Sequence, residues 1–334
     1  MSEPSPSARR GRLARGAVAL AVLLAVAGYA AMQYVSGDRA TPRCTVVSDN
    51  GDGARYEMSA EQAVNAATVA VVGTRRGMPE RAVTIALATA LQESGLHNIR
   101  HGDRDSLGLF QQRPSQGWGS ERQIMDPVYS SGRFYERLEK VPGYSRLPLT
   151  VAAQRVQRSG FPQAYAKHEP DAVLLAAALT GRAPATLTCT GRPGVDPGGP
   201  ARVRRALARD FGRDVERDVP APEAGQRGRS LSVTVSGGVT AAPEDDAPRR
   251  GWELAHWAVA NATALHIERV AFAGREWRAG GSGGGWRMAR AGSGAESPLP
   301  EASAGPSAGG KVPSPEAPDV SGARTREVRI VAGQ

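Results

Sequence analysis

An uncharged, apolar run near the N-terminus constrains this chain more than any other sequence feature. The run covers residues 16–35, is rich in Ala, Val and Leu, and follows a flank, residues 1–15, that carries four arginines. A helix needs about 20 such residues to cross a bilayer. Because positive flanks stay in the cytoplasm, the pattern predicts a cytoplasmic N-terminus, a transmembrane helix over 16–35, and an extracytoplasmic location for everything after Asp38.

The same run can also be interpreted as a cleaved signal peptide. Ala25-Val26-Ala27 has the small-x-small form of a cleavage site. We favour a retained anchor because the apolar run continues past that site to Val35. The predicted localisation is a single-pass protein of the cell membrane, and secretion after cleavage near Ala27 is the alternative. The bulk of the chain lies outside the cytoplasm in either case.

Both cysteines, Cys44 and Cys189, follow the apolar run. Disulfides form and persist in oxidising compartments outside the cytoplasm. The residues between the two cysteines have the patterning of a globular domain, so we predict that the cysteines pair and tie its ends together. Two unpaired, buried thiols are the alternative. In the chain-entropy model, closing so long a loop contributes about 4–5 kcal/mol as an upper estimate.

The composition narrows the classes of partner and cofactor. The chain has 334 residues, with 42 Lys+Arg against 33 Asp+Glu and a net charge of +9. Only three of these cations are lysines, which indicates arginine-rich codon usage rather than a nucleic-acid-binding patch. The five histidines share no metal-ligand spacing, and neither a phosphate-binding loop nor a nucleophile elbow occurs. We therefore predict no metal, no cofactor and no nucleic-acid partner.

Changes in composition divide the exported part into two predicted domains. The first, over 44–190, is expected to be mainly α with a small β or loop insert. A Gly/Pro linker over 191–200 leads to a small α/β domain over 201–333, whose low-complexity residues 291–325 are predicted to be disordered. Most tryptophans lie in this second domain, where we favour core packing over a glycan-binding face. The helices expected in the first domain cover residues 59–72, 79–95, 130–139, 149–158 and 171–179.

Glu93 is the candidate catalytic residue. The apolar residues after Pro79 recur with a helical period up to Gly95. They predict a helix whose last turn carries Glu93 on a face of small residues. A carboxyl that is half buried beside a polar loop is favoured to keep its proton and to act as a general acid. The alternative is a solvated glutamate at a helix end, where its charge opposes the helix dipole.

Two linked motifs in the first predicted domain resemble a known family. Residues 92–96 read Gln-Glu-Ser-Gly-Leu, and residues 105–112 read Asp-Ser-Leu-Gly-Leu-Phe-Gln-Gln. The pair is similar to the signature of lysozyme-like lytic transglycosylases, in which a Glu-Ser step ends the catalytic helix and a Gly-Leu-Met-Gln segment lines the substrate groove. Phe110 replaces the Met, and the downstream Ala-Tyr-Asn element is not evident; residues 152–159 occupy roughly its place. The chain resembles a divergent, membrane-anchored branch from high-GC Gram-positive bacteria.

The resemblance spans about residues 55–190 and implies a lysozyme-like catalytic domain. It also implies an activity, cleavage of the β-1,4 bond between N-acetylmuramic acid and N-acetylglucosamine in peptidoglycan. Glu93 would protonate the leaving oxygen. In a transglycosylase the same carboxylate then removes a proton from the muramic acid 6-hydroxyl, which closes an anhydro ring. The implied partners are glycan strands, together with the cytoplasmic membrane through residues 16–35; protein partners are not predicted.

Two alternatives to a transglycosylase stay open. A muramidase would use Asp103 or Asp105 as a second carboxylate across the cleft, although both residues lie in a run that favours turn formation. A non-catalytic peptidoglycan-binding or division scaffold would keep the groove and lack the chemistry. The products released from the cell wall distinguish the three hypotheses.

The remaining candidate groove residues are polar or aromatic side chains suited to holding a sugar. Hydroxyl, carboxylate and amide groups offer partners for the N-acetyl and hydroxyl groups of the glycan, and large aromatic rings offer an apolar face, although they are as often part of a core. Ser94 is also expected to orient Glu93. The predicted substrate-binding residues are Ser94, Asp105, Ser106, Gly108, Phe110, Gln111, Gln112, Trp118, Gln154, Gln157 and Tyr165.

Overall fold

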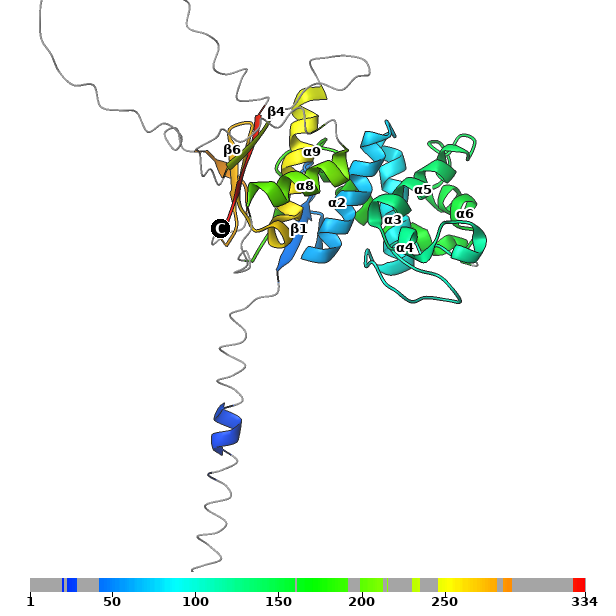
Figure 1. Cartoon of the computed structure of the whole chain (residues 1–334), viewed down its shortest axis with the longest axis horizontal. Coiled ribbons are helices and arrows are strands. Elements are labelled where there is room, and N and C mark those ends of the chain that lie inside the picture. The colour runs from blue at the N-terminus through cyan, green and yellow to red at the C-terminus, as the bar shows by residue number, and fades with distance from the viewer. Residues whose placement is uncertain are drawn as a thin grey trace, which may run out of the picture. The chain divides into compact units, whose positions relative to one another are not determined.

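The computed structural model describes residues 20, 23–28, 42–159, 161–191, 199–212, 215, 230–234, 246–280, 285–289 and 327–333 (Figure 1). The chain divides into two units, Met1–Thr41 and Pro42–Gln334. In the first unit, residues 23–28 are helical. No helix within the described ranges is both long and apolar enough to span a bilayer. The other residues of the predicted anchor over 16–35, apart from residue 20, lie outside the described residues.

Two buried helices form the centre of the second unit. Helix α2 (Ala60–Arg75) begins at Ser59, whose hydroxyl accepts from the backbone of Gln62 in a capping box. Helix α3 (Glu80–Ser94) follows and ends at Gly95, which adopts the left-handed conformation with a φ of 62°. Small residues on α2 allow close packing: a Cβ added at Gly73 would lie 2.7 Å from the Tyr135 hydroxyl. Helices α2 and α3 pack against each other, and the chain continues from the end of α3 into a loop.

The loop after α3 and a set of shorter helices surround the end of α3. The loop contains a single isolated bridge, between Leu107 and Gln112. Helices α5, α6, α7 and η2 all contact α3. The elements of this region are the 3-10 helix η1 (Pro114–Gln116), α4 (Glu121–Ile124), α5 (Pro127–Glu139), α6 (Leu149–Gln157), the 3-10 helix η2 (Pro162–His168) and α7 (Glu169–Leu179).

A three-stranded antiparallel sheet joins the two ends of this helical region. Its strands are β1 (Arg43–Val47), β2 (Arg55–Ser59) and β3 (Leu187–Cys189), in the order β2-β1-β3. Cys44 lies opposite Cys189 in the register of β1 and β3, and the two form a disulfide with their Cα atoms 4.0 Å apart. The predicted pairing of the two cysteines is therefore confirmed.

The rest of the described chain adds three helices and a second antiparallel sheet. The five strands have the order β4-β8-β5-β6-β7, so the last strand of the chain lies inside the sheet and pairs with both β4 and β5. The elements are α8 (Pro200–Phe211), β4 (Ser230–Thr234), α9 (Asp246–Ala260), α10 (Ala262–Leu265), β5 (Ile267–Phe272), β6 (Arg275–Arg278), β7 (Arg287–Met288) and β8 (Glu327–Ala332).

Helices α8 and α9 pack against α2 through apolar and polar contacts. The fully buried carboxylate of Asp210 on α8 accepts from the Trp257 indole at 2.8 Å and from the Thr68 hydroxyl at 3.3 Å. On the neighbouring turn of α9, Glu253 bonds the Thr74 hydroxyl. Trp252, Trp257 and Trp277 are buried, which confirms the expectation that the tryptophans pack in the core.

The predicted fold class is wrong. It combined a mainly α lysozyme-like domain bearing a small β or loop insert with a separate small α/β domain and an N-terminal transmembrane helix. The described residues instead form helices with two antiparallel sheets, and a single hydrophobic core runs across both predicted domains. The described ranges contain no membrane-spanning helix. Local periodicity identified the apolar faces but carried no information about which faces meet, and this is the physical reason for the error.

Figure 1 shows the arrangement of the second unit. Helices α3 to α6 lie at one end, and the five-stranded sheet lies at the other, with α2, α8 and α9 between them. The end of α3 and the loop that follows it are therefore remote from the second sheet. This end of the unit holds Glu93.

Candidate active site

Glu93 lies on the last turn of α3, and its side chain is half-buried. The helix ends there because Gly95 turns the backbone into the left-handed region and donates to the carbonyls of Ala90 and Leu91. The neighbouring hydroxyl, that of Ser94, donates to the Leu109 carbonyl at 2.8 Å. This bond fastens the Gly-Leu-Phe-Gln segment to the end of the helix, so the two motifs read from the sequence meet in space.

Tyr165, on η2, reaches Glu93 directly. Its hydroxyl donates to Oε1 of Glu93 at 2.7 Å. The side chain of Tyr165 is fully buried, and this burial, together with the negative charge of Glu93, raises the pKa of the Tyr165 phenol. The phenol therefore keeps its proton and remains a donor to the carboxylate.

The environment of Glu93 favours the protonated carboxyl. Burial raises the pKa of Glu93, and hydrogen bonds from Tyr165 and Gln157 lower it by less. Gln157, on α6, also donates to the carbonyl of Phe110 at 2.7 Å. The carboxyl is therefore held by the Tyr165 hydroxyl, in an environment that raises its pKa, as a general acid needs.

The two aspartates considered as second carboxylates have other contacts. One carboxylate oxygen of Asp105 accepts from Nε of Arg113 at 2.7 Å, and the other accepts from the backbone N–H of Ser115 at 2.8 Å. These hydrogen bonds hold the pKa of Asp105 well below its usual range. The Asp103 side chain is 93% exposed, and its carbonyl accepts from Ser106 in a turn. The Asp105 side chain and the Asp103 backbone thus serve the conformation of the loop.

The polar residues predicted to line the groove mostly build the loop itself. The amide of Gln112 is buried and donates to the Ser130 carbonyl at 3.0 Å. Gln111 adopts a left-handed φ of 46°, and its side chain donates to the Gly108 carbonyl at 3.2 Å. Gly108 itself is required by close approach, because a Cβ there would lie 2.8 Å from the Ile124 carbonyl oxygen. Ser106 is buried.

The two aromatic residues predicted to offer a face to sugar rings are buried as well. Phe110 is fully buried and stacks on Phe134 with ring centroids 4.8 Å apart. Trp118 is also buried, and the guanidinium of Arg137 covers its ring at 3.4 Å from the centroid. Both rings pack in the core in the described state, and neither presents a free face.

The structure thus brings together only part of the predicted set. Tyr165 is hydrogen-bonded to Glu93, Gln157 is close enough to lower the pKa of Glu93, and Ser94 connects the helix to the loop. Gln154, on the same helix as Gln157, donates to the carbonyl of Ser159 at 2.7 Å and so fixes the segment that leads into η2.

Sequence reasoning missed two residues of that segment. The Ser159 hydroxyl accepts from the backbone N–H of Phe161 at 3.1 Å, and Ser159 is close enough to Tyr165 to lower the pKa of its phenol. Phe161 is 80% exposed. The available signal was the aromatic residue of the polar run Arg-Ser-Gly-Phe-Pro at 158–162, which directly follows an amphipathic helix.

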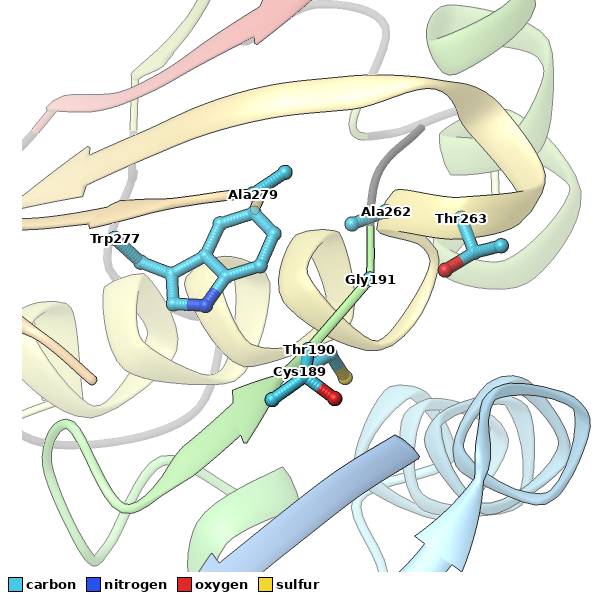
Figure 2. Close-up of a pocket in the computed structure, with 7 residues that line it drawn as sticks. All are labelled: Cys189, Thr190, Gly191, Ala262, Thr263, Trp277 and Ala279. Carbon is cyan, nitrogen blue, oxygen red and sulfur yellow. The ribbon is translucent and has the colours of Figure 1, made fainter. Parts of the chain in front are cut away.

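Two cavities have linings that do not include Glu93. One is a pocket lined by the end of β3, α10 and β6 (Figure 2). It has no space for a water molecule, so it is a gap in the packing between these elements. The other, of about 620 Å³, is open, and residues from the loop, from α4 and from the link between α4 and α5 line it, including Arg100, Glu121 and Asp126. Among the described residues, no group of His, Cys, Asp and Glu side chains could hold a metal ion.

Comparison with known families concerns the C-terminal part. Residues 201–297 match the family described as VldE, C-terminal domain. The match begins inside α8, includes α9 and strands β4 to β7, and stops before β8, which completes the sheet. It covers a minority of the chain and does not include Glu93. The chain matches no curated protein sequence.

Proposed function

We propose that this chain is a peptidoglycan lytic transglycosylase that cleaves the β-1,4 bond between N-acetylmuramic acid and N-acetylglucosamine. The observation that carries the proposal is the half-buried Glu93 carboxyl, held at 2.7 Å by the buried Tyr165 hydroxyl. The resemblance of residues 92–96 and 105–112 to the lytic transglycosylase motifs supports the same conclusion, since the Ser94–Leu109 hydrogen bond joins these two segments.

Glu93 performs two proton transfers in this mechanism. The protonated carboxyl gives its proton to the glycosidic oxygen as the bond to the muramic acid C1 breaks and positive charge develops on the sugar ring. The carboxylate that forms is stabilised by the Tyr165 hydroxyl and the Gln157 amide. It then removes the proton of the muramic acid 6-hydroxyl while that oxygen bonds to C1, which closes the anhydro ring and returns Glu93 to its protonated form.

The state of the aspartates supports a mechanism with one carboxylate. Hydrolysis with a second carboxylate needs a group free to activate water or to attack C1. Asp105 is bound by Arg113 and by the Ser115 backbone, and Asp103 is almost fully exposed. The contacts of Asp105 favour the transglycosylase over a muramidase that uses Asp105.

The proposed site of action is outside the cytoplasm. The Cys44–Cys189 disulfide supports this location, because such bonds persist in oxidising compartments. The proposed substrate, the glycan strand of the cell wall, lies in the same compartment.

Release of soluble muropeptides from purified sacculi tests the proposal. Glu93→Gln keeps the shape of the side chain and its hydrogen bond with Tyr165 but cannot give up a proton as an acid, so release is expected to cease. The matched control is Glu57→Gln, which changes an exposed glutamate of β2 and is expected to keep full activity. Release that survives in Glu93→Gln removes this residue from the mechanism. Binding to sacculi without release by the unaltered protein indicates a scaffold instead.

A further inference from the structure

A site that holds a pyranose ring needs an apolar face for the C–H surface of the sugar. The two aromatic residues predicted to supply it, Phe110 and Trp118, are buried and covered by Phe134 and Arg137. The arrangement around Glu93 therefore lacks the expected apolar face, unless another aromatic residue provides it.

Phe161 is the aromatic residue that remains. Its side chain is 80% exposed, and it is the one aromatic among the large exposed hydrophobic residues of the described ranges. The others in the second unit are Val47, Val173 and Met288. A phenylalanine that is left in water on a folded protein gives up a substantial hydrophobic stabilisation, which a ligand that covers the ring would restore.

Phe161 directly precedes η2, the short helix that carries Tyr165, and Tyr165 contacts the proposed acid. The backbone N–H of Phe161 donates to the Ser159 hydroxyl at 3.1 Å, and Ser159 is close enough to Tyr165 to affect the pKa of its phenol. The Tyr165 hydroxyl in turn donates to Glu93 at 2.7 Å. Phe161 is therefore a near neighbour of the carboxyl, on the segment between α6 and η2.

The described residues on either side of Phe161 make backbone hydrogen bonds. Arg158 ends α6 in the left-handed conformation, and the Gln154 amide holds the Ser159 carbonyl at 2.7 Å. On the other side, Pro162 opens η2, and the Phe161 carbonyl accepts from Ala164 at 3.1 Å.

We infer that Phe161 is the platform on which one N-acetylated pyranose ring of the glycan strand rests beside Glu93. This inference rests on the proposed function and adds a substrate-binding residue to it. The ring contributes binding through the apolar face of the sugar, while Glu93 contributes the chemistry. Because the contact is made equally in the bound and reacting states, loss of the ring is expected to raise KM and to leave kcat nearly unchanged.

The test measures binding and cleavage separately with purified sacculi. Binding is measured by sedimentation of the full chain carrying Glu93→Gln, with and without Phe161→Ala. Cleavage is measured as the initial rate of muropeptide release by the chain that keeps Glu93. Phe161→Ala is expected to weaken binding by about tenfold, as loss of part of a buried aromatic contact would do, and Phe161→Trp is expected to restore it.

Met288→Ala is the matched control, because it shortens another exposed apolar side chain, 75% exposed, on β7. The inference is overturned if Phe161→Ala binds sacculi as tightly as the control does. It is also overturned if Met288→Ala loses as much binding as Phe161→Ala. If Phe161→Ala leaves binding unchanged and the chain that keeps Glu93 still releases muropeptides, the platform role of Phe161 is refuted and the proposed function stands. Binding that depends on Phe161 without any release by the unaltered chain supports the platform and refutes the proposed cleavage.

Discussion

Replacing Tyr165 with phenylalanine removes one hydroxyl from the site and leaves the ring in place. In the structure, that hydroxyl donates to Oε1 of Glu93 at 2.7 Å from a fully buried position. A hydrogen bond to a charged group contributes about 1.5–3 kcal/mol, and each 1.36 kcal/mol corresponds to about tenfold in rate. Because the carboxylate forms as Glu93 gives up its proton, we expect kcat/KM of Tyr165→Phe to fall by about 10-fold to 100-fold.

The same variant is expected to change the pH profile in a defined direction. The Tyr165 hydrogen bond lowers the pKa of Glu93, so its loss raises that pKa. The first step needs the protonated acid, and activity is lost as pH rises through the pKa of Glu93. The alkaline limb of kcat/KM against pH should therefore move to higher pH in Tyr165→Phe.

The assay is muropeptide release from sacculi between pH 4 and pH 9, with Tyr144→Phe as the control. Tyr144 is only partly buried and lies after α5, without a contact to Glu93 in the described structure. Its variant should reproduce the unaltered profile. An alkaline limb that stays in place or moves to lower pH in Tyr165→Phe contradicts the assignment of Tyr165 as a donor to the catalytic carboxylate.

Three further predictions concern the stability of the fold and the coupling of the two motifs. Ser94→Ala removes the hydrogen bond to the Leu109 carbonyl and should lower the free energy of unfolding by about 1 kcal/mol, measured by urea denaturation; an unchanged midpoint counts against this bond. Burial lowers the pKa of His256 to about 4, so its neutral form stabilises the fold above the unfolded pKa of about 6.5, and about 3 kcal/mol is lost as the pH falls from 6.5 to 4. Urea midpoints measured across that range should show this loss, and His256→Gln should lack it. Reduction of the Cys44–Cys189 disulfide opens a loop of sequence separation 145 and should cost about 4–5 kcal/mol; denaturation that is insensitive to reductant would falsify this expectation.

Local sequence signals predicted much of the helical region. The capping box at Ser59 and the glycine at position 95 define the start of α2 and the end of α3 as expected, because caps act within one turn of the helix. The helix expected over 149–158 is α6, Leu149–Gln157. The disulfide followed from the predicted compartment and from the presence of only two cysteines.

Long-range packing could not be predicted from the sequence in the same way. The periodicity of α9 shows an apolar face, but nothing in the period indicates that Glu253 and Trp257 meet Thr74 and Asp210 on α2 and α8. The inner position of β8 depends on pairing with strands far away in the chain. Phe110 and Trp118 show the same limit within the site, because a large aromatic residue in a loop has the same local signal whether it lines a groove or packs inward.

The mass spectrum of the muropeptides released from purified sacculi tests the central claim most directly. If Glu93 alone carries both proton transfers, the unaltered chain releases products that end in 1,6-anhydro-N-acetylmuramic acid, and Glu93→Gln releases none. Products with reducing N-acetylmuramic acid ends, which are 18 Da heavier by one water molecule, would show that water attacks C1 and would contradict the account.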